Sequence, residues 1–170
     1  DSVFQIAAHE DVVPVEELYR CCEAAREILT GEHAVGRVIA RPFIGKEPDF
    51  RRTANRRDYA LEPPAETMCD LISGAGMEVI GIGKIGDIFA HRGITREIHT
   101  TGNADGMKKT LEVARQKFTG LCFVNLVDFD MNYGHRRDIA GYAQAVMELD
   151  RFLQDLYNIL GDDDCMIVTA

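Results

Sequence analysis

Short apolar runs alternate along this chain with helical patterns, in which apolar positions recur at three- to four-residue spacing. Strand-like runs cover residues 1–8, 35–42, 77–82, 94–100, 121–127 and 165–169. Helical spacing covers residues 15–29, 65–73, 103–118 and 136–160. Because helices and apolar strands follow one another in turn, the pattern predicts an α/β fold with parallel strands and right-handed crossovers.

The last helix and the last strand-like run are expected to belong to the hydrophobic core. The helix at 136–160 carries one apolar stripe at helical spacing, which predicts a buried face. Residues 165–169 are expected to form a buried strand. The stripe consists of Ile139, Ala143, Val146, Leu149, Leu153, Leu156 and Leu160.

The strand at 35–42 places Arg37, Ile39 and Arg41 on one side and is expected to end at Pro42. Two interpretations remain open for this side. It is either a solvated edge or a clamp for an anion, because guanidinium groups match phosphate oxygens. Residues 46–59 are also basic, and such a run is more often a solvated loop or a salt-bridge surface than a ligand site.

Leu61-Glu-Pro-Pro64 is the best internal boundary, because two prolines cannot continue a strand ladder but do favour the start of a helix. After the strand at 77–82 comes the glycine-rich turn Gly83–Asp87. This turn lacks the spacing of a phosphate-binding loop, so nucleotide binding is only weakly indicated. Lys84 nevertheless follows a strand end, where a positive charge can meet an anion.

Length and charge narrow the function. The 170 residues suffice for one ordinary domain or two small pieces, and the net charge of −9 argues against a nucleic-acid or membrane surface. No apolar run approaches the roughly 18–20 residues that span a bilayer. The five cysteines have no metal-ligand spacing, which favours reduced thiols in a cytosolic protein.

The chain is organised around the stretch from Leu121 to Asp138. Its apolar run delivers Asp128 and Asp130 to the strand end, and a short turn leads to His135. Ligands of open α/β sheets lie at the carboxyl ends of the strands. A carboxylate oxygen and a neutral imidazole suit Mn²⁺, Fe²⁺ or Zn²⁺. The alternative is that Asp130 caps a turn and His135 begins the helix, since two ligands do not complete a site.

Several sequence blocks together resemble the phosphopentomutase family of the alkaline phosphatase superfamily. The resemblance runs from end to end in the same order, and no single block carries it. The blocks are Asp1-Ser-Val-Phe-Gln-Ile-Ala7, Gly36-Arg-Val-Ile-Ala-Arg-Pro-Phe-Ile-Gly45, Arg52-Thr-Ala-Asn-Arg-Arg-Asp58, Leu61-Glu-Pro-Pro64, Val79–Ile85 and Val127–Asp138 with its Asp-Phe-Asp-x-x-x-Gly-His-Arg-Arg-Asp pattern.

The resemblance implies part of a three-layer α/β core with parallel strands and helices, plus part of an inserted α/β cap. Residues 1–60 resemble the later part of the cap, and residues 61–170 resemble the metal-binding core. Because both ends of the chain fall on strand-like runs, we expect a segment of a longer protein. Exposed strand edges invite association, so the segment alone is expected to form oligomers or aggregates.

The family interconverts ribose 1-phosphate and ribose 5-phosphate, and their deoxy forms, in nucleoside salvage. The resemblance implies a cytoplasmic isomerase that is expected to be a monomer when intact, with two Mn²⁺ ions and a phosphorylated threonine that lies upstream of Asp1. It gives Asp130 and His135 as metal ligands. The substrate contacts that it implies are Asp1, Ser2, Val3, Arg37, Ile39 and Lys84.

Without the threonine and the remaining ligands, no catalytic nucleophile is expected in this chain, and the chain alone is expected to be inactive. Two other functions stay open. One is a metal-dependent phosphatase of the same superfamily, and the other is a non-catalytic α/β module that binds sugar phosphates.

Overall fold

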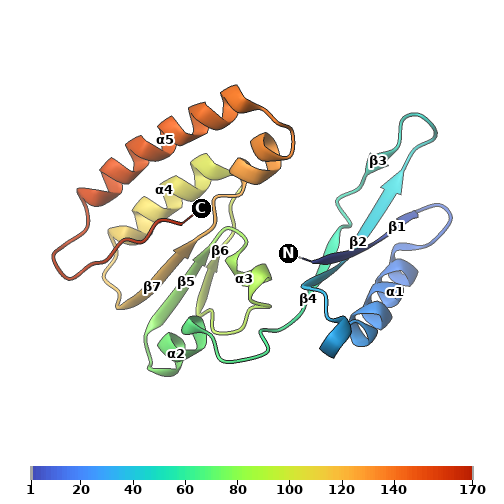
Figure 1. The fold of residues 1–170 in the computed structure, drawn as a ribbon, viewed down its shortest axis with the longest axis horizontal. Helices are drawn as coiled ribbons and strands as arrows, with labels where there is room; N and C mark the ends of the chain where they lie inside the picture. Colours follow the sequence, from blue (N-terminus) through green and yellow to red (C-terminus); the bar gives the residue numbers. More distant parts are fainter. Residues whose placement is uncertain (1, 170) are drawn as a thin grey trace. The chain divides into compact units, whose positions relative to one another are not determined.

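The computed structural model describes residues 2–169, whose strands form two sheets in two separate units (Figure 1). The first unit holds the chain up to Pro64 together with Asp87–Ala90, and the second holds Ala65–Gly86 and the chain from His91 onward. Strands and helices alternate, so the predicted α/β class with parallel strands is confirmed. Within residues 2–169, no helix is both long and apolar enough to cross a membrane.

Strand β2 (Arg37–Ile44) lies at the centre of the sheet in the first unit. It pairs in parallel with β1 (Val3–His9) and antiparallel with β3 (Arg51–Arg52) and β4 (Arg57–Ala60). Helix α1 (Val15–Ile28) connects β1 to β2 and packs on this sheet. A helix is the usual connection between neighbouring parallel strands, because the chain must return to the end of the sheet at which the first strand began.

One face of this sheet forms the core of the first unit. Leu18 and Cys22 of α1 are buried against Val38 and Ala40 of β2. Successive side chains of a strand point to opposite faces. Arg37, which alternates with these residues, therefore belongs to the other face of the sheet together with the other odd-numbered residues of β2.

Strand β2 does not end at Pro42, as the sequence had suggested, but continues to Ile44. A proline has no N–H group to donate, so it is tolerated where the ladder is interrupted. β4 pairs with residues 37–40 and β3 with residues 43–44, which leaves Pro42 at the break between them. Its carbonyl still accepts the N–H of Thr53 at 3.2 Å.

The interpretation of Arg37, Ile39 and Arg41 as a solvated edge is wrong, because β2 has neighbouring strands on both sides. Ile39 is only 2% exposed. The basic residues 46–59 are also more than a loop, since they include β3 and β4. Arginine-rich strands were not recognised because their polar residues do not show the apolar alternation of a half-buried strand.

The second unit is built on a parallel three-stranded sheet in the order β6-β5-β7. The π-helical turn η2 follows β7 directly, and the short helix α3 straddles the division between the units. The elements are α2 (Met68–Gly74), β5 (Glu78–Ile82), α3 (Ile85–Ile88), β6 (Arg96–Ile98), α4 (Asn103–Ala114), β7 (Gly120–Val124), η2 (Phe129–Gly134) and α5 (Ile139–Tyr157).

Strand β5 is the buried centre of this sheet. Its residues Ile80 and Ile82 are completely buried and pack with Val113 of α4, and residues of β6 and β7 complete the cluster. Helix α4 contacts β5 and β7 on one side and α5 on the other. The parallel arrangement places the carboxyl ends of β5 and β7 beside each other, so the segments that follow them share one edge of the sheet.

Helix α2 begins at Met68 and not at Ala65, because Thr67 supplies the signal for its first turn. The Thr67 hydroxyl accepts the N–H of Asp70, while the Asp70 carboxylate accepts the N–H of Thr67 at 2.7 Å. This reciprocal capping box satisfies two N–H groups that the helix leaves open. The backbone N–H of Thr67 is the main cause that lowers the pKa of Asp70.

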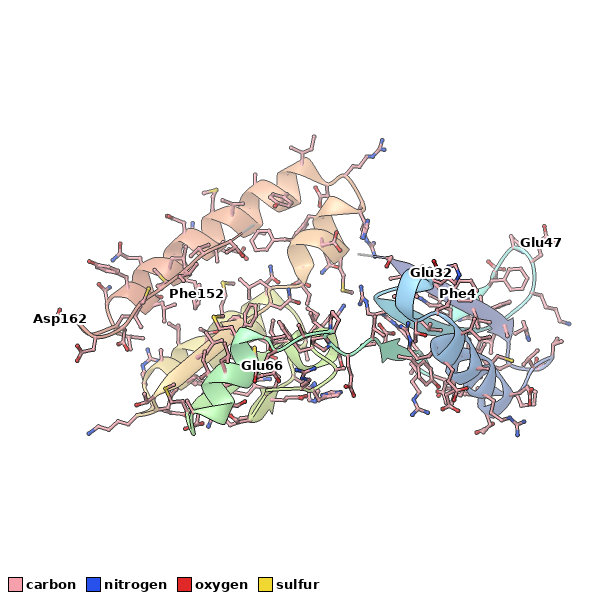
Figure 2. The ribbon with its side chains drawn as sticks, turned by 60° about the horizontal axis from the view of Figure 1, so that its bottom comes forward. Phe4, Glu32, Glu47, Glu66, Phe152 and Asp162 are labelled. Atoms are coloured by element: carbon pink, nitrogen blue, oxygen red, sulfur yellow. The ribbon has the colours of Figure 1, made fainter. Side chains whose placement is uncertain are left out.

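The apolar stripe predicted for the last helix is only partly correct. The buried residues of α5 are Ala145, Phe152 and Leu156, whereas Ile139 is 84% exposed and Val146 is also exposed. Figure 2 shows Phe152 on the side of α5 that faces the rest of its unit. The buried face is therefore rotated from the predicted stripe, and α5 carries apolar residues that nothing in residues 2–169 covers.

The buried strand predicted at 165–169 is absent from the structure. Residues 165–169 belong to no strand, and Ile167 is 81% exposed. An apolar run predicts a strand only where a neighbouring strand offers hydrogen bonds, and this segment has none among the described residues.

Candidate metal-binding site

The π-helical turn η2 brings together two residues that are five positions apart. The N–H of His135 donates to the carbonyl of Asp130 at 2.9 Å, and the N–H of Asp138 donates to the carbonyl of Tyr133 at 3.0 Å. Hydrogen bonds over five residues define a π turn, a rare form that recurs at functional sites. Because one such turn separates Asp130 from His135, both side chains leave the backbone on the same side.

The side chains of Asp130 and His135 face each other. His135 Nε2 lies 3.3 Å from Asp130 Oδ2, and each side chain is 75% exposed. Two donors that each lie about 2.1 Å from one ion, at an angle between a right angle and a tetrahedral one, are roughly 3.0–3.4 Å apart. The oxygen and nitrogen therefore have the chemistry and the spacing of two ligands of one divalent cation.

This pair is incomplete as a metal site by itself. In residues 2–169, no cluster of three or more His, Cys, Asp or Glu side chains is arranged to hold a metal ion. The alternative in which Asp130 caps a turn is also not what the structure shows. Helix α5 is capped by Asp138, whose carboxylate accepts the N–H of Gly141 at 2.9 Å, and it begins only at Ile139.

Asp128 fixes the start of this turn, a role that sequence analysis missed. Its Oδ2 accepts the N–H of Asn103 at 2.6 Å, and its own N–H donates to Asn103 Oδ1 at 2.8 Å. Oδ1 of Asp128 also accepts from the side chain of Asn132 at 2.9 Å. The carboxylate thus serves the first N–H of α4, which Gly102 at the N-cap position cannot satisfy with a side chain.

The space around this contact is tight and polar. Asn103 is 7% exposed, and a Cβ at Gly102 would lie 2.8 Å from Asp128 Oδ2. A cavity of about 120 Å³ adjoins the pair and is lined in part by Tyr133 and Glu148. The sequence places Asp128 at a strand end, but its partner is 25 residues upstream, so only the fold reveals the pairing.

We expect Asp128→Ala to lower the free energy of unfolding by about 2 kcal/mol, because it removes two hydrogen bonds of the carboxylate, one from Asn132 and one from the first N–H of α4. Asn103→Ala removes the other hydrogen bond of the pair, which Asn103 Oδ1 accepts from the backbone N–H of Asp128, and should lower the free energy of unfolding by about 1 kcal/mol or more. Urea unfolding followed by circular dichroism measures both values. Asp155→Ala on the exposed side of α5 is the control, with an expected change within about 0.5 kcal/mol. An unchanged free energy of unfolding in both variants would contradict the pairing.

Lys84 reaches the same turn from the end of β5. Its Nζ lies 3.2 Å from Sδ of Met131, the residue that follows Asp130. Gly83 permits this approach, because its φ of +85° is open to glycine and its missing Cβ would lie 2.4 Å from the carbonyl oxygen of Asn125. The structure therefore brings Lys84, predicted as a substrate contact, to the turn that carries both predicted metal ligands.

The other predicted substrate contacts lie in the first unit. Ser2 Oγ accepts the N–H of Gly36 at 3.0 Å, and Val3 pairs with Arg37 across β1 and β2. Arg37 forms an ion pair with Asp58 at 3.6 Å, and Ile39 is buried. Asp1, also predicted as a substrate contact, lies outside the described residues. Val3, Arg37 and Ile39 occupy positions of the sheet face that is opposite α1.

This chain is similar to known proteins along its whole length. Phosphopentomutases from Lachnoclostridium phytofermentans, Carboxydothermus hydrogenoformans and Acetivibrio thermocellus are 55%, 56% and 55% identical to this chain over all 170 residues. The alignment covers 100% of this chain but 44% of each relative, so the chain spans less than half the length of these relatives. The family model described as Metalloenzyme superfamily matches residues 15–170, a range that includes Asp130 and His135. By this match the chain belongs to the metalloenzyme superfamily.

Proposed function

We propose that the full-length protein containing this chain is a phosphopentomutase, which interconverts ribose 1-phosphate and ribose 5-phosphate and their deoxy forms. The observation that carries the proposal is the Asp130–His135 pair, 3.3 Å apart on one π turn, within a sequence about half identical to phosphopentomutases along its whole length. A divalent metal is expected from the superfamily.

We assign Asp130 and His135 as ligands of Mn²⁺, with two such ions in the full-length enzyme. When bound, the ions neutralise charge on the phosphoryl oxygens and orient them for in-line transfer. The imidazole of His135 must be neutral to bind a metal, so metal binding releases a proton when that ring is charged. The other ligands and the nucleophilic threonine are assigned to the length of the relatives that this chain does not cover, and the chain alone is expected to be inactive.

The remaining residues have positioning roles in this proposal. Lys84 supplies a positive charge beside the metal-binding turn and is suited to a phosphoryl oxygen. Ser2, Val3, Arg37 and Ile39, together with Asp1, are assigned to the pentose phosphate. In each half-reaction, one phosphorus–oxygen bond breaks as another forms between phosphorus and the receiving oxygen, which gives up its proton. The transfer therefore needs precise positioning more than further covalent chemistry.

Two alternatives differ in what the full-length protein does with ribose 1-phosphate. A phosphatase of the superfamily releases inorganic phosphate, and a binding module changes neither the sugar nor the phosphate. The phosphatase would use the same metal ligands, whereas the binding module does not require them.

We place the protein in the cytoplasm, which agrees with the free cysteines of the described residues.

The test is an assay of the full-length protein with ribose 1-phosphate and Mn²⁺, followed by ³¹P NMR. We expect the signal of ribose 5-phosphate to replace that of the substrate, and we expect EDTA to stop the reaction. Release of inorganic phosphate without the isomer would favour the phosphatase. An unchanged spectrum, in a preparation that binds ribose 5-phosphate without metal, would favour the binding module.

A further inference from the structure

One face of the sheet in the first unit carries a row of arginines. Helix α1 covers only the face that contains Val38 and Ala40. On the opposite face, Arg41 is paired in register with Ala7 of β1, and Phe43 of β2 is paired with Arg52 of β3. This basic face is part of a chain whose net charge is −9, so its positive charge is a local feature and not a result of overall composition.

Asp58, which belongs to the same face, is already paired with other arginines. Asp58 forms a bidentate pair with Arg56, with distances of 2.7 and 2.6 Å, and an ion pair with Arg37. By contrast, the structure gives the side chains of Arg41 and Arg52 neither an ion pair nor a hydrogen bond within residues 2–169. Among residues 2–169, this face therefore has more guanidinium groups than carboxylates paired with them.

Arg41 is in an unfavourable environment for a charged side chain. Its Nε is buried and has no hydrogen-bond partner in the described part of the chain. Burial lowers the pKa of its guanidinium, and the neighbouring positive charges of Arg56 and Arg52 act in the same direction, partly opposed by Asp58. A buried charged donor without a partner is unfavourable, and a bound anion would relieve both the missing hydrogen bond and the repulsion.

A groove of about 380 Å³ opens beside Arg41, a volume within the range of sites for small molecules. Arg51 and Arg52 line it together with Arg41. The rings of Phe43 and Phe50 form an apolar wall, with their centroids 5.4 Å apart in an edge-to-face contact. The groove thus combines a cationic wall for an anion with an apolar wall for an uncharged body.

We propose that this groove, built by Arg41, Arg51, Arg52, Phe43 and Phe50, binds the phosphate group of a sugar phosphate. The proposal rests on the proposed function for the identity of the ligand, because a pentose phosphate is the anion that such an enzyme must hold. Forked guanidinium groups donate pairs of hydrogen bonds to phosphate oxygens. This site is additional to Arg37, since it lies in the carboxyl-terminal half of β2 and uses residues of β3.

The test is calorimetric titration of the full-length protein, after removal of metal with EDTA, with ribose 5-phosphate, inorganic phosphate and ribose. Ribose 5-phosphate and phosphate are expected to bind, and ribose is not. Arg41→Gln and Arg52→Gln should each weaken binding of ribose 5-phosphate by roughly tenfold or more, as expected for the loss of a charge-assisted hydrogen bond. Arg52 is exposed, so its substitution tests the groove even if Arg41→Gln lowers stability.

Arg57→Gln is the matched control, because it removes the same charge from the same basic region. Arg57 lies on the other face, 5.0 Å from the ring centroid of Tyr59 and 5.3 Å from that of Tyr19. The affinity of the Arg57→Gln variant for ribose 5-phosphate should stay within about twofold of that of the parent protein. Equal losses in all three variants, or no loss in the first two, would overturn the groove. Loss confined to the first two variants in a protein that does not isomerise the sugar would support the groove and reject the mutase.

Discussion

Replacing His135 by alanine is expected to lower the Mn²⁺ affinity of the full-length protein by at least about 100-fold and its mutase turnover by about 1000-fold. The affinity falls because His135 is a ligand itself. Substitution of residues that merely hydrogen-bond to a metal ligand already lowers metal affinity roughly 10–100-fold. Turnover falls because the charge of the transferred phosphoryl group loses a stabilisation of several kcal/mol. Titration with Mn²⁺ followed by electron paramagnetic resonance measures affinity without relying on activity.

His99→Ala is the control for this experiment, since His99 is an exposed histidine of the same unit. Its Mn²⁺ affinity and turnover should match those of the parent. Asp130→Asn should resemble His135→Ala, because it keeps the shape of the side chain but removes the negative charge. If both ligand variants bind Mn²⁺ as the parent does, the two side chains do not hold a metal and the proposed site is wrong.

Gly83→Ala is expected to lower the free energy of unfolding by about 3 kcal/mol. A left-handed conformation costs a residue with a Cβ about 1–2 kcal/mol, and crowding in a packed region adds about 1–3 kcal/mol. The crowding is severe here, because the new Cβ would lie 2.4 Å from a backbone oxygen, which cannot rotate away as a side chain does. Unfolding in urea gives the value.

Gly74→Ala provides the opposite expectation within the same unit. Gly74 ends α2, has no atom within 4 Å of its Cβ position apart from its chain neighbours and the backbone of its own helix, and does not adopt a positive φ. Alanine should therefore leave stability unchanged or raise it by up to about 1 kcal/mol. A similar loss for both variants would show that the close approach of Gly83 to Asn125 is not what makes the first substitution costly.

The fold was predictable from sequence wherever one pattern decides the structure. The apolar run at 77–82 and the helical spacing at 15–29 correspond to β5 and α1 within a residue or two. The errors occur where the structure of a segment depends on another strand that lies beside it. Pro42 is tolerated because of a gap between two other strands, and the apolar run at 165–169 forms no strand because no described strand lies beside it.

The candidate site was predictable in its residue types but not in its geometry. The spacing of Asp130 and His135 suggested a shared crevice, and the π turn is the local structure that makes them face each other. The pairing of Asp128 with Asn103 could not be predicted, because it depends on how α4 packs beside β7. Arg41 and Arg52 were visible only as basic residues, since the groove requires three strands to be in register.

The uncovered apolar residues of α5 have a consequence for handling the protein in solution. Ile139, Met147 and Tyr157 are each more than half exposed, and such groups attract one another in water. At low ionic strength the net charge of −9 keeps molecules apart, but its repulsion acts only over about 10 Å at 0.1 M salt. Sulfate strengthens the attraction further. Colloidal stability should therefore fall as salt is added, and phenyl-substituted resins should retain the chain strongly.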